Sequence, residues 1–432
     1  MGTDLGVAMR TALFSVLLAA GSGTAMAQAP QASPVAGQEI RSPFGIQQTI
    51  VVTGDRMADY RRRLAECLAR HCPPNEDIDA TTALAGALFV AGEYREARTL
   101  LLASIGRNRR EAEHYPVPVS DLYRANALVA RHLGFDEDAR LSTWEILHAL
   151  QRGIPVEDGR HFTARLEIIE SLIAFGEYVQ ARDQLRELAN RAQAAGRDDV
   201  VATAQMRGLW LEYIQAPESN EIVRELVTLS ASPDARRSTA AKMLLIRIYT
   251  ARGQTRQANA LIAQVGSTGN RRRLLSAPDF DLNQQDNLGT SSGNGRTIQN
   301  VANTPPPRPG EQSPTQLMGA NLADRMTDLY DQLIDVGFHI RPDGTVADVQ
   351  IVNRRGEPGW APPLLRSITG RRYAIAPDGT ETYRVERYTY TAERRTQGLS
   401  GTRISNRSPR GRVEYRELSE TTIPAGRPAG SP

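Results

Sequence analysis

The chain has 432 residues, which is enough for two or three domains and a sizeable core. Its formal net charge is only +3, which argues against a dedicated nucleic-acid-binding protein. Every basic residue except Lys242 is an arginine, and arginines cluster at 61–63, 107–110 and 271–273. We expect these clusters to lie on the solvated surface, with an anionic envelope polymer as the alternative ligand.

Residues 1–27 have the pattern of a signal peptide. Arg10 precedes an apolar run at 12–20, and Ala25-Met26-Ala27 matches the small-x-small cleavage pattern, which places the cut before Gln28. The run is shorter than the roughly 20 residues that span a bilayer. We therefore expect a cleaved signal, a periplasmic protein and no integral membrane span in the mature chain. A retained N-terminal anchor is the alternative.

Residues 28–59 are predicted to form an extended, disordered leader before the first helix. The leader contains Ile50, Val51 and Val52, followed by Thr53-Gly54, and this run is similar to one near the N-terminus of TonB-dependent outer-membrane receptors. An extended apolar segment can add to an exposed sheet edge through backbone hydrogen bonds. The three apolar residues are therefore candidate partner-binding residues, and an ordinary lead-in to the first helix is the alternative.

The two cysteines, Cys67 and Cys72, are expected to form a disulfide at a helix end. Their spacing places them about 140° apart on a regular helix, so a bond requires the helix to unwind near Cys72. Pro73 and Pro74 supply that break, and an oxidising compartment favours the bond. The alternative is a metal or redox site with His71. That set lacks a distant fourth ligand, and C-x4-C is not the redox C-x-x-C spacing.

Residues 60–266 carry a repeated Gly-x4-Ala spacing, each copy between two helical runs. The copies begin at Gly92, Gly134, Gly176 and Gly253, and a degenerate unit without the glycine fits at 216–222. Glycine can end the first helix in a left-handed conformation, and the small alanine lets the next helix approach closely. The pattern predicts five helix pairs with a period of about 40 residues.

These repeats resemble the tetratricopeptide class. Ala85 and Ala127 lie seven residues before their glycines, where that family also has a small residue, whereas Ile169 and Ile246 replace it in later units. The period also exceeds the 34 residues of that family. We therefore predict a tetratricopeptide-like α-solenoid, which by default binds a protein or peptide. The alternative is that the repeats only space and support the C-terminal part.

Two polar stretches flank the last predicted domain. Residues 267–315 are rich in Ser, Gly, Asn and Pro and are predicted to be a flexible, partly polyproline linker, with a short extended stretch at 274–282. Residues 397–432 form a polar tail in which Val413, Tyr415 and Leu418 indicate one further strand that extends the sheet.

Residues 316–396 are predicted to form a small α+β domain. Val336, Phe338 and Ile340 alternate as in a half-buried strand, a Pro-Asp-Gly turn follows, and the chain returns as a second strand to residue 352. A helix that ends at Gly370, a second Pro-Asp-Gly turn at 377–379 and a strand at 383–391 complete the order. The apolar phase of that strand changes between Val385 and Tyr388, which indicates a bulge or burial on both faces.

Residues 340–346, 349–356 and 372–377 resemble motifs of the C-terminal domain of TonB-type energy transducers, over roughly 60 residues. The resemblance implies a β-β-α-β domain that engages a partner by edge-strand pairing or by its sheet face. On this basis the candidate partner-binding residues on the edge of the last strand are Tyr383, Val385, Tyr388 and Tyr390. Structural packing is the alternative role of each.

No catalytic signature is present: the sequence contains no H-E-x-x-H, no P-loop, no G-x-G-x-x-G after a strand and no G-x-S-x-G. We expect neither a cofactor nor a metal. The sequence therefore predicts a non-catalytic periplasmic interaction or adaptor protein linked to outer-membrane transport, with TonB-dependent receptors or other envelope components as partners. One alternative is a TonB-type energy transducer with an uncleaved anchor, and the other is a cell-wall-associated enzyme with an unrecognised site.

Overall fold

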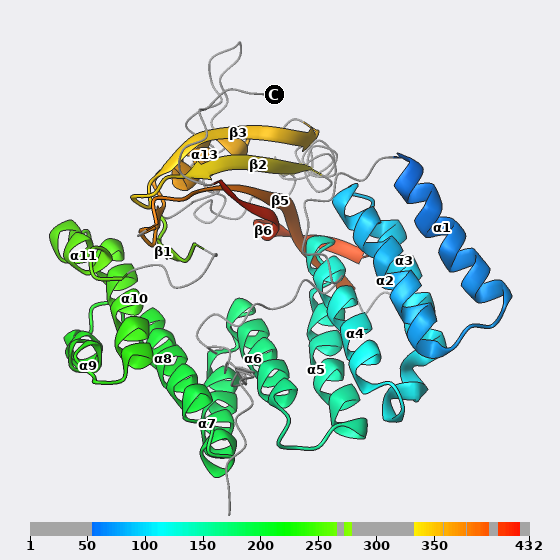
Figure 1. Cartoon of the computed structure of the whole chain (residues 1–432), viewed down its shortest axis with the longest axis horizontal. Helices are drawn as coiled ribbons and strands as arrows, with labels where there is room; N and C mark the ends of the chain where they lie inside the picture. Colours follow the sequence, from blue (N-terminus) through cyan, green and yellow to red (C-terminus); the bar gives the residue numbers. More distant parts are fainter. Residues whose placement is uncertain are drawn as a thin grey trace, which may run out of the picture. The chain divides into compact units, whose positions relative to one another are not determined.

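The computed structural model describes residues 54–265, 272–278, 332–356, 358–376, 378–396 and 405–423. The predicted signal peptide, the candidate residues Ile50, Val51 and Val52, and most of the predicted linker lie outside these ranges. The described helices and strands all belong to one compact unit. Helices form the first part of the described chain, and an antiparallel sheet with one helix forms the last part (Figure 1).

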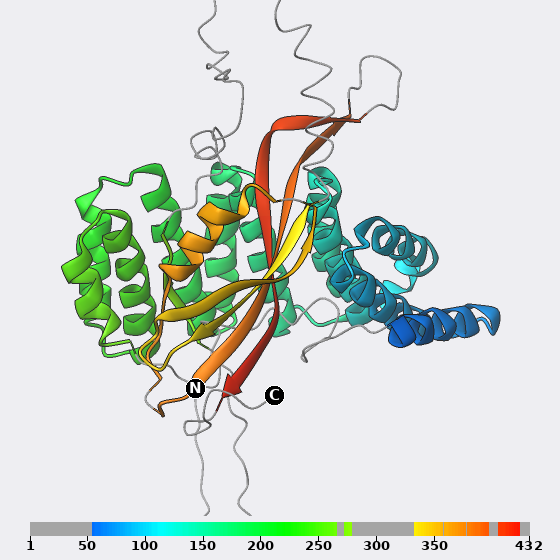
Figure 2. The same ribbon diagram turned by 90° about the horizontal axis from the view of Figure 1, so that it is seen from above.

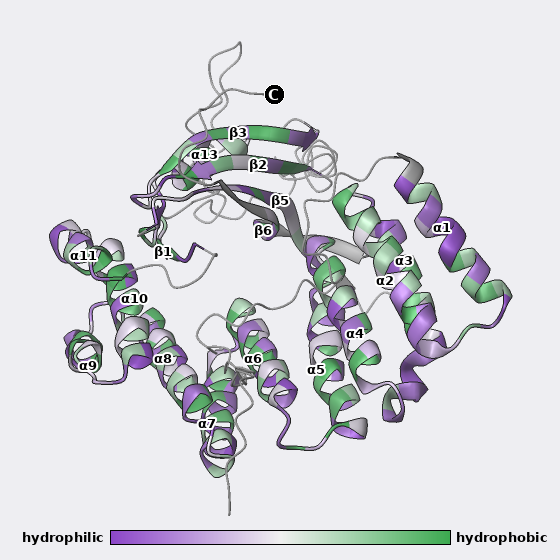
Figure 3. Ribbon diagram, viewed as in Figure 1, coloured by the Kyte–Doolittle hydropathy of each residue, from purple (hydrophilic) through white to green (hydrophobic). Residues whose placement is uncertain are grey.

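Each helix packs against the next one along the chain (Figure 1). Figure 3 shows that most of them mix hydrophobic and hydrophilic residues, as helices with one buried face do. The helices are α1 (Gly54–Ala69), α2 (Pro74–Val90), α3 (Tyr94–Asn108), η1 (Arg109–Glu113), α4 (Pro116–His132), α5 (Asp136–Gly153), α6 (Gly159–Ala174), α7 (Tyr178–Ala194), α8 (Asp198–Gln215), α9 (Asn220–Ser230), α10 (Ala235–Ala251) and α11 (Thr255–Ile262).

The predicted glycine turns are confirmed. The four glycines at 92, 134, 176 and 253 have φ between 67° and 81°, the left-handed conformation that ends a helix. At Gly92, for example, the amide of Glu93 donates to the carbonyl of Leu88 at 2.8 Å. The alanines that follow the turns, Ala97, Ala139, Ala181 and Ala258, are at most 3% exposed. The unit without a glycine is also present, because α8 ends at Gln215 and α9 begins at Asn220.

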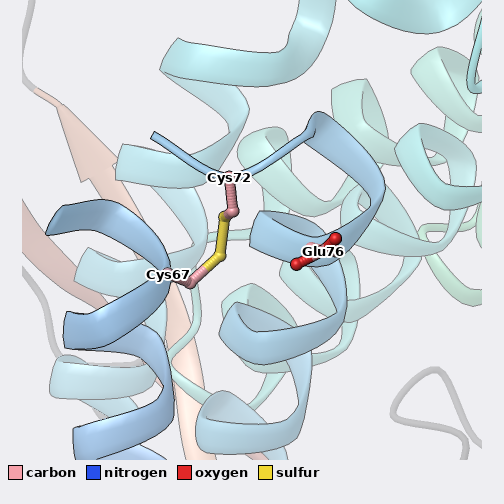
Figure 4. Close-up of side chains that lie close together, drawn as sticks. All are labelled: Cys67, Cys72 and Glu76. Carbon is pink, nitrogen blue, oxygen red and sulfur yellow. A yellow bond between two sulfur atoms is a disulfide. The ribbon is translucent and has the colours of Figure 1, made fainter. Parts of the chain in front are cut away.

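The first helix begins earlier than predicted, at Gly54 inside the expected leader. The predicted disulfide between Cys67 and Cys72 is present, with Cα atoms 5.1 Å apart (Figure 4). The backbone leaves the helix at His71, which has a φ of 51°. The carboxylate of Glu76 lies near both sulfur atoms, but these are bonded to each other.

The main sheet is antiparallel with the strand order β3-β2-β5-β6, and β1 pairs with β4 in a second small sheet. The turn at Pro342-Asp343-Gly344 joins β2 to β3 as predicted: Gly344 has a φ of 79°, and Asp343 accepts from the amide of Thr345 at 2.9 Å. The elements are β1 (Leu274–Ser276), β2 (Leu333–Ile340), β3 (Val346–Arg355), α13 (Ala361–Thr369), β4 (Arg372–Tyr373), β5 (Glu381–Thr396) and β6 (Ser405–Ile423).

The core of the sheet lies between β2 and α13. Val336, Phe338 and Ile340 are fully buried on the predicted face and pack with Trp360 and Ile368. The irregularity predicted near Val385 is present, both as a bulge and as burial on both faces of the strand. The pairing of β5 with β6 shifts register between Val385 and Glu386, and residues 386–389 are buried on both faces.

The further strand predicted in the tail is confirmed, the extended stretch predicted within 274–282 is confirmed at 274–276, and one arginine prediction is wrong. The tail contains a 19-residue strand, β6, that pairs along β5, so the sheet extends well beyond residue 396 (Figure 2). Residues 274–276, inside the predicted linker, form β1 and pair with β4. Arg272 is only 4% exposed and donates to the carbonyl of Ala374 at 2.9 Å, so this member of an arginine cluster is buried, not solvated. No helix in the described ranges is long and apolar enough to cross a bilayer.

Candidate protein-binding site

The strand that was predicted to be the free edge, β5, is internal to the sheet. It pairs with β2 on one side and with β6 on the other. The backbone of Tyr383, Val385, Tyr388 and Tyr390 is therefore already engaged, and the prediction that these residues form an open edge is wrong. The reason is β6, which the sequence indicated only through three apolar residues in a polar tail.

Two of the four candidate side chains are committed to packing. Tyr388 is 3% exposed, and its hydroxyl donates to the carboxylate of Glu386, which Arg371 also contacts at 2.6 Å. Burial raises the pKa of Tyr388, and the charge of Glu386 raises it further. The ring of Tyr390 lies over Gly411, where an added Cβ would fall 1.9 Å from the phenol oxygen.

The outer strands of the described sheet are β3 and β6, and they differ in what covers them. β6 is held against the helices by its side chains: Arg412 contacts Asp136 at 2.7 Å, and Glu414 accepts from Arg131 at 2.9 Å. Its Leu418 packs against the apolar cluster of α2–α4. The side chains of β6 that contact the helices therefore form part of the junction between helices and sheet.

The second half of β3 is exposed. From Gln350 to Arg355 every side chain is exposed, and Ile351 and Val352 are 37% and 45% exposed. Figure 3 shows the strand as hydrophobic along its middle and hydrophilic at its arrowhead. Exposed apolar side chains on an outer strand are the feature that strand addition uses, since the backbone groups of such an edge are available for pairing.

Two irregularities shorten the regular part of β3. The pairing with β2 shifts between Gly337 and His339, opposite Asp348, which has a φ of 51°, and again between Asp335 and Val336, opposite Val352. Bulges of this kind twist an edge and terminate pairing. The usable edge is therefore a short run that begins at Val349, and we call residues 349–355 the β3 edge.

Tyr383 lies beside the β3 edge. A Cβ added to Gly337 would meet both the hydroxyl oxygen of Tyr383, at 2.2 Å, and a methyl group of Val352, at 2.9 Å. Only glycine at 337 leaves room for these two side chains to come together. The ring of Tyr383 also lies 4.9 Å from the ring of His339, whose Nδ1 is 2.7 Å from a carboxylate oxygen of Glu381. Tyr383 therefore remains a candidate binding residue, through its side chain and not through its backbone.

The sheet is fixed to the helices by a buried arginine. Arg387 is 0% exposed, makes two hydrogen bonds to Asp335 at 2.6 and 2.7 Å, and donates to the backbone carbonyl of Phe89 at the end of α2. Burial alone would lower the pKa of Arg387, but the hydrogen bonds and charge of Asp335 and the neighbouring Tyr94 together outweigh burial, so the pKa is raised. The last carbonyls of a helix lack intrahelical partners and carry partial negative charge, so a guanidinium group is well suited to them.

The same chemistry recurs at the end of α4. Arg394 donates from Nε to the carbonyl of Leu133 at 3.0 Å and from its backbone amide to that of Gly134 at 2.8 Å. Nearby, the hydroxyl of Thr389 makes hydrogen bonds with the hydroxyl of Tyr94 and with Nδ1 of His132, each at 2.9 Å. Burial lowers the pKa of His132 to about 3, so this ring is neutral at ordinary pH.

At the β3 end, Arg355 completes this pattern. It donates to the carbonyl of Gly92 at 2.9 Å and pairs with Glu93 at 3.1 Å. Leu333, the first residue of β2, belongs to the apolar cluster of α1–α4. The β3 edge is therefore presented from a rigid support, because one of its ends is attached to the turn between α2 and α3.

A separate hollow of about 450 Å³ lies among α7, α8 and α9. Arg182 lines it and donates to the side-chain oxygen of Gln215 at 2.9 Å. The lining contains three glutamates and a serine but neither histidine nor cysteine: Arg182, Glu212, Gln215, Ala216, Ser219, Glu221, Ile222 and Glu225.

Sequence reasoning missed the buried arginines at 272 and 387 and the half-buried Arg394, and the signal for them was weak. In β5 the polar residues Arg387, Thr389 and Thr391 alternate with aromatic ones, which is typical of a solvated face. The helices cover that face, and Arg387 and Arg394 donate to carbonyls at helix ends, which a linear pattern does not reveal.

No family model matches the sequence. No curated protein matches it either. Among solved structures, the chain is similar to the crystal structure of BtubC (BKLC) from P. vanneervenii, with a TM-score of 0.38 and 17% sequence identity. That match covers 51% of this chain and 96% of the other. A likeness at this level carries no conclusion about function.

Proposed function

We propose that this chain is a non-catalytic interaction or adaptor protein of the periplasm, which binds an extended segment of an envelope protein along the β3 edge. The exposure of Ile351 and Val352 on an outer strand is the single observation that carries the proposal. An added strand would gain backbone hydrogen bonds from the edge and apolar contact from these two side chains and Tyr383. TonB-dependent receptors, or other envelope components with such a segment, are the proposed partners.

The finer description of the fold belongs to the same proposal. The left-handed glycines and buried alanines support a tetratricopeptide-like α-solenoid at 60–266. The order β2, β3, α13 and β5 supports a TonB C-terminal-like domain, to which β6 is an addition. The Cys67–Cys72 disulfide supports an oxidising compartment, in agreement with the predicted export signal.

The rigid attachment of the sheet supports an adaptor role. Arg387, Arg394 and Arg355 tie the sheet to helix ends, so a strand bound at β3 is held in a fixed relation to the helices. The internal partners of these arginines also favour a structural role over catalysis. Because Leu333 and Arg387 bury themselves against α2, the test requires the full chain and not an isolated C-terminal fragment.

A photo-crosslinking amino acid at position 351 of the full chain, expressed with its export signal, tests the proposal. Position 179 is the matched control. Val179 is also an exposed β-branched residue, at 69%, but it lies on α7. We expect adducts with envelope proteins at 351 that are absent at 179 and that decrease when Val352→Arg is added. The same adducts at both positions, or adducts that Val352→Arg leaves unchanged, would contradict a binding edge at β3.

A further inference from the structure

Ion pairs connect the first helices of successive repeat pairs. Arg124 on α4 contacts Glu167 on α6 at 2.9 Å, and Arg207 on α8 contacts Glu170 on α6 at 2.6 Å. At both of these steps along the helical array, an arginine on one helix meets a carboxylate on the neighbouring one. The chain thus supplies both charges of each pair, from α4 to α6 and from α6 to α8.

The next step, from α8 to α10, departs from this series. α8 contributes Arg207, and α10 contributes a second arginine, Arg247, in place of a carboxylate. The two helices are in contact and share one apolar cluster, in which the sequence neighbours of both arginines, Met206 and Ile248, are buried. In the part of the chain that the structure describes, the side chain of Arg247 makes neither a hydrogen bond nor an ion pair.

The surroundings of Arg247 are unfavourable for a lone charge. Burial lowers its pKa, and the nearby charge of Arg207 lowers it further. Its surface is nevertheless exposed, and Arg207 is 34% exposed. Both observations hold for a guanidinium group that is crowded by protein but that solvent reaches from one side. Two positive charges held close together in such a place repel each other, and an anion between them would remove that cost.

The two arginines lie on the side of the helices that faces the sheet. On α4, Arg131 follows Arg124 by seven residues, or two helical turns, and contacts β6 at 2.9 Å through Glu414. On α10, Met243 precedes Arg247 by one turn and packs against the apolar cluster that joins this helix to β1. Charges between packed elements are screened by salt less than charges on an open surface.

We propose that Arg207 and Arg247 together bind a carboxylate of an acidic segment from a partner protein. A planar guanidinium group matches a carboxylate through two parallel hydrogen bonds, and its five N–H donors allow Arg207 to keep Glu170 while it binds a second anion. The chain fills the two preceding steps with its own glutamates. A carboxylate from the partner continues the series at the step where the chain has none, and this site is separate from the β3 edge.

Thermal unfolding of the full chain tests the site, with a hexaglutamate peptide as the probe. Without peptide, Arg247→Glu should raise the unfolding midpoint by about 1–3 °C, because it places a carboxylate beside Arg207. Hexaglutamate should raise the midpoint of the native chain but not that of Arg247→Glu. Arg256→Glu is the matched control, because Arg256 is an exposed arginine on α11 and the change in net charge is the same. It should keep the native midpoint and the native response.

A direct titration of labelled hexaglutamate should show an affinity at least about tenfold lower for Arg247→Glu than for Arg256→Glu. A lower midpoint for Arg247→Glu without peptide would mean that Arg247 supports the fold itself, and would overturn the proposal. Equal responses of the two variants to hexaglutamate, or no response of the native chain, would overturn it too. A native chain that responds to inorganic phosphate but not to hexaglutamate would assign the site to phosphate groups and remove the acidic protein segment.

Discussion

The glycine turns after α2 and α4 can be compared with those after α6 and α10. All four have the same left-handed φ and the same hydrogen-bond pattern, and each is followed by a buried alanine. Their surroundings differ. A Cβ added to Gly134 would lie 2.0 Å from the carbonyl oxygen of Ala392, and one on Gly92 would lie 2.9 Å from Leu333. One on Gly176 or Gly253 would have no neighbour within 4 Å in the described part of the chain.

The difference shows that one repeated motif serves two purposes in this molecule. At all four turns glycine ends a helix and starts the next. At the first two it also lets the sheet approach the helix end, where arginines from β3 and β5 bind the free carbonyls. The repeat sequence alone predicts that glycine ends the helix. It does not predict the approach of the sheet, because that depends on residues more than 240 positions away.

The largest loss of stability at the junction between helices and sheet should come from Arg387→Met, which leaves Asp335 buried without its arginine partner. Removal of one member of a buried ion pair costs about 3–5 kcal/mol, and urea unfolding of the full chain measures it. The double variant Arg387→Met with Asp335→Leu is the control and should recover a large part of the loss. A cost below about 1 kcal/mol for the single variant would mean that the sheet is not fixed to α2 by this pair.

Gly134→Ala and Gly176→Ala sharpen the comparison directly. Both introduce a side chain at a left-handed residue, which costs about 1–2 kcal/mol. Gly134→Ala should cost about 2 kcal/mol more, because its new Cβ clashes with the carbonyl oxygen of Ala392 and overpacking adds to the strain. Denaturant unfolding of the two variants gives the difference, and equal losses would show that the sheet yields freely at this turn.

The smallest predicted effect is that the stability of the same junction depends on pH. The pKa of His132 is lowered to about 3 by burial, from an ordinary 6.5, so the unfolded chain binds a proton that the folded chain does not. Stability should therefore decrease as the pH falls from about 6.5 toward 3, by about 2 kcal/mol between pH 6.5 and 5. The charged groups around the ring are Arg131, Arg387, Glu414 and Arg416.

The variant His132→Gln should remove this slope above pH 5, as measured by unfolding at several pH values. Glu414 does not interfere in that window. Burial alone would raise its pKa, but the charges of Arg131 and Arg412 outweigh burial and lower it below its ordinary 4.5. Its contribution to stability is therefore lost only at lower pH. An unchanged slope in the glutamine variant would assign the effect to another group.

Sequence reasoning succeeded where the cause is local. The glycine turns, the Asp343 turn, the alternation in β2 and the Cys67–Cys72 bond all follow from residues a few positions apart. It failed where the cause is distant. The edge predicted at Tyr383–Tyr390 is filled by β6, whose polar sequence gives little indication of a strand, and Arg387 is buried only because α2 covers that face. For the same reason the β3 edge emerged only once the strand order was known.

The two bulges in β3 have a consequence for the behaviour of the protein in bulk. A long, flat outer strand with apolar residues is a template on which molecules stack into fibrils. The pairing of β3 with β2 shifts register at Asp348 and again at Val352. The arginines at 354 and 355 add positive charge at the C-terminal end of β3. The β3 edge, which begins after the first shift and is interrupted by the second, can take one short strand but is too short and too twisted to seed a growing cross-β array. Concentrated samples are therefore expected to remain free of fibrils.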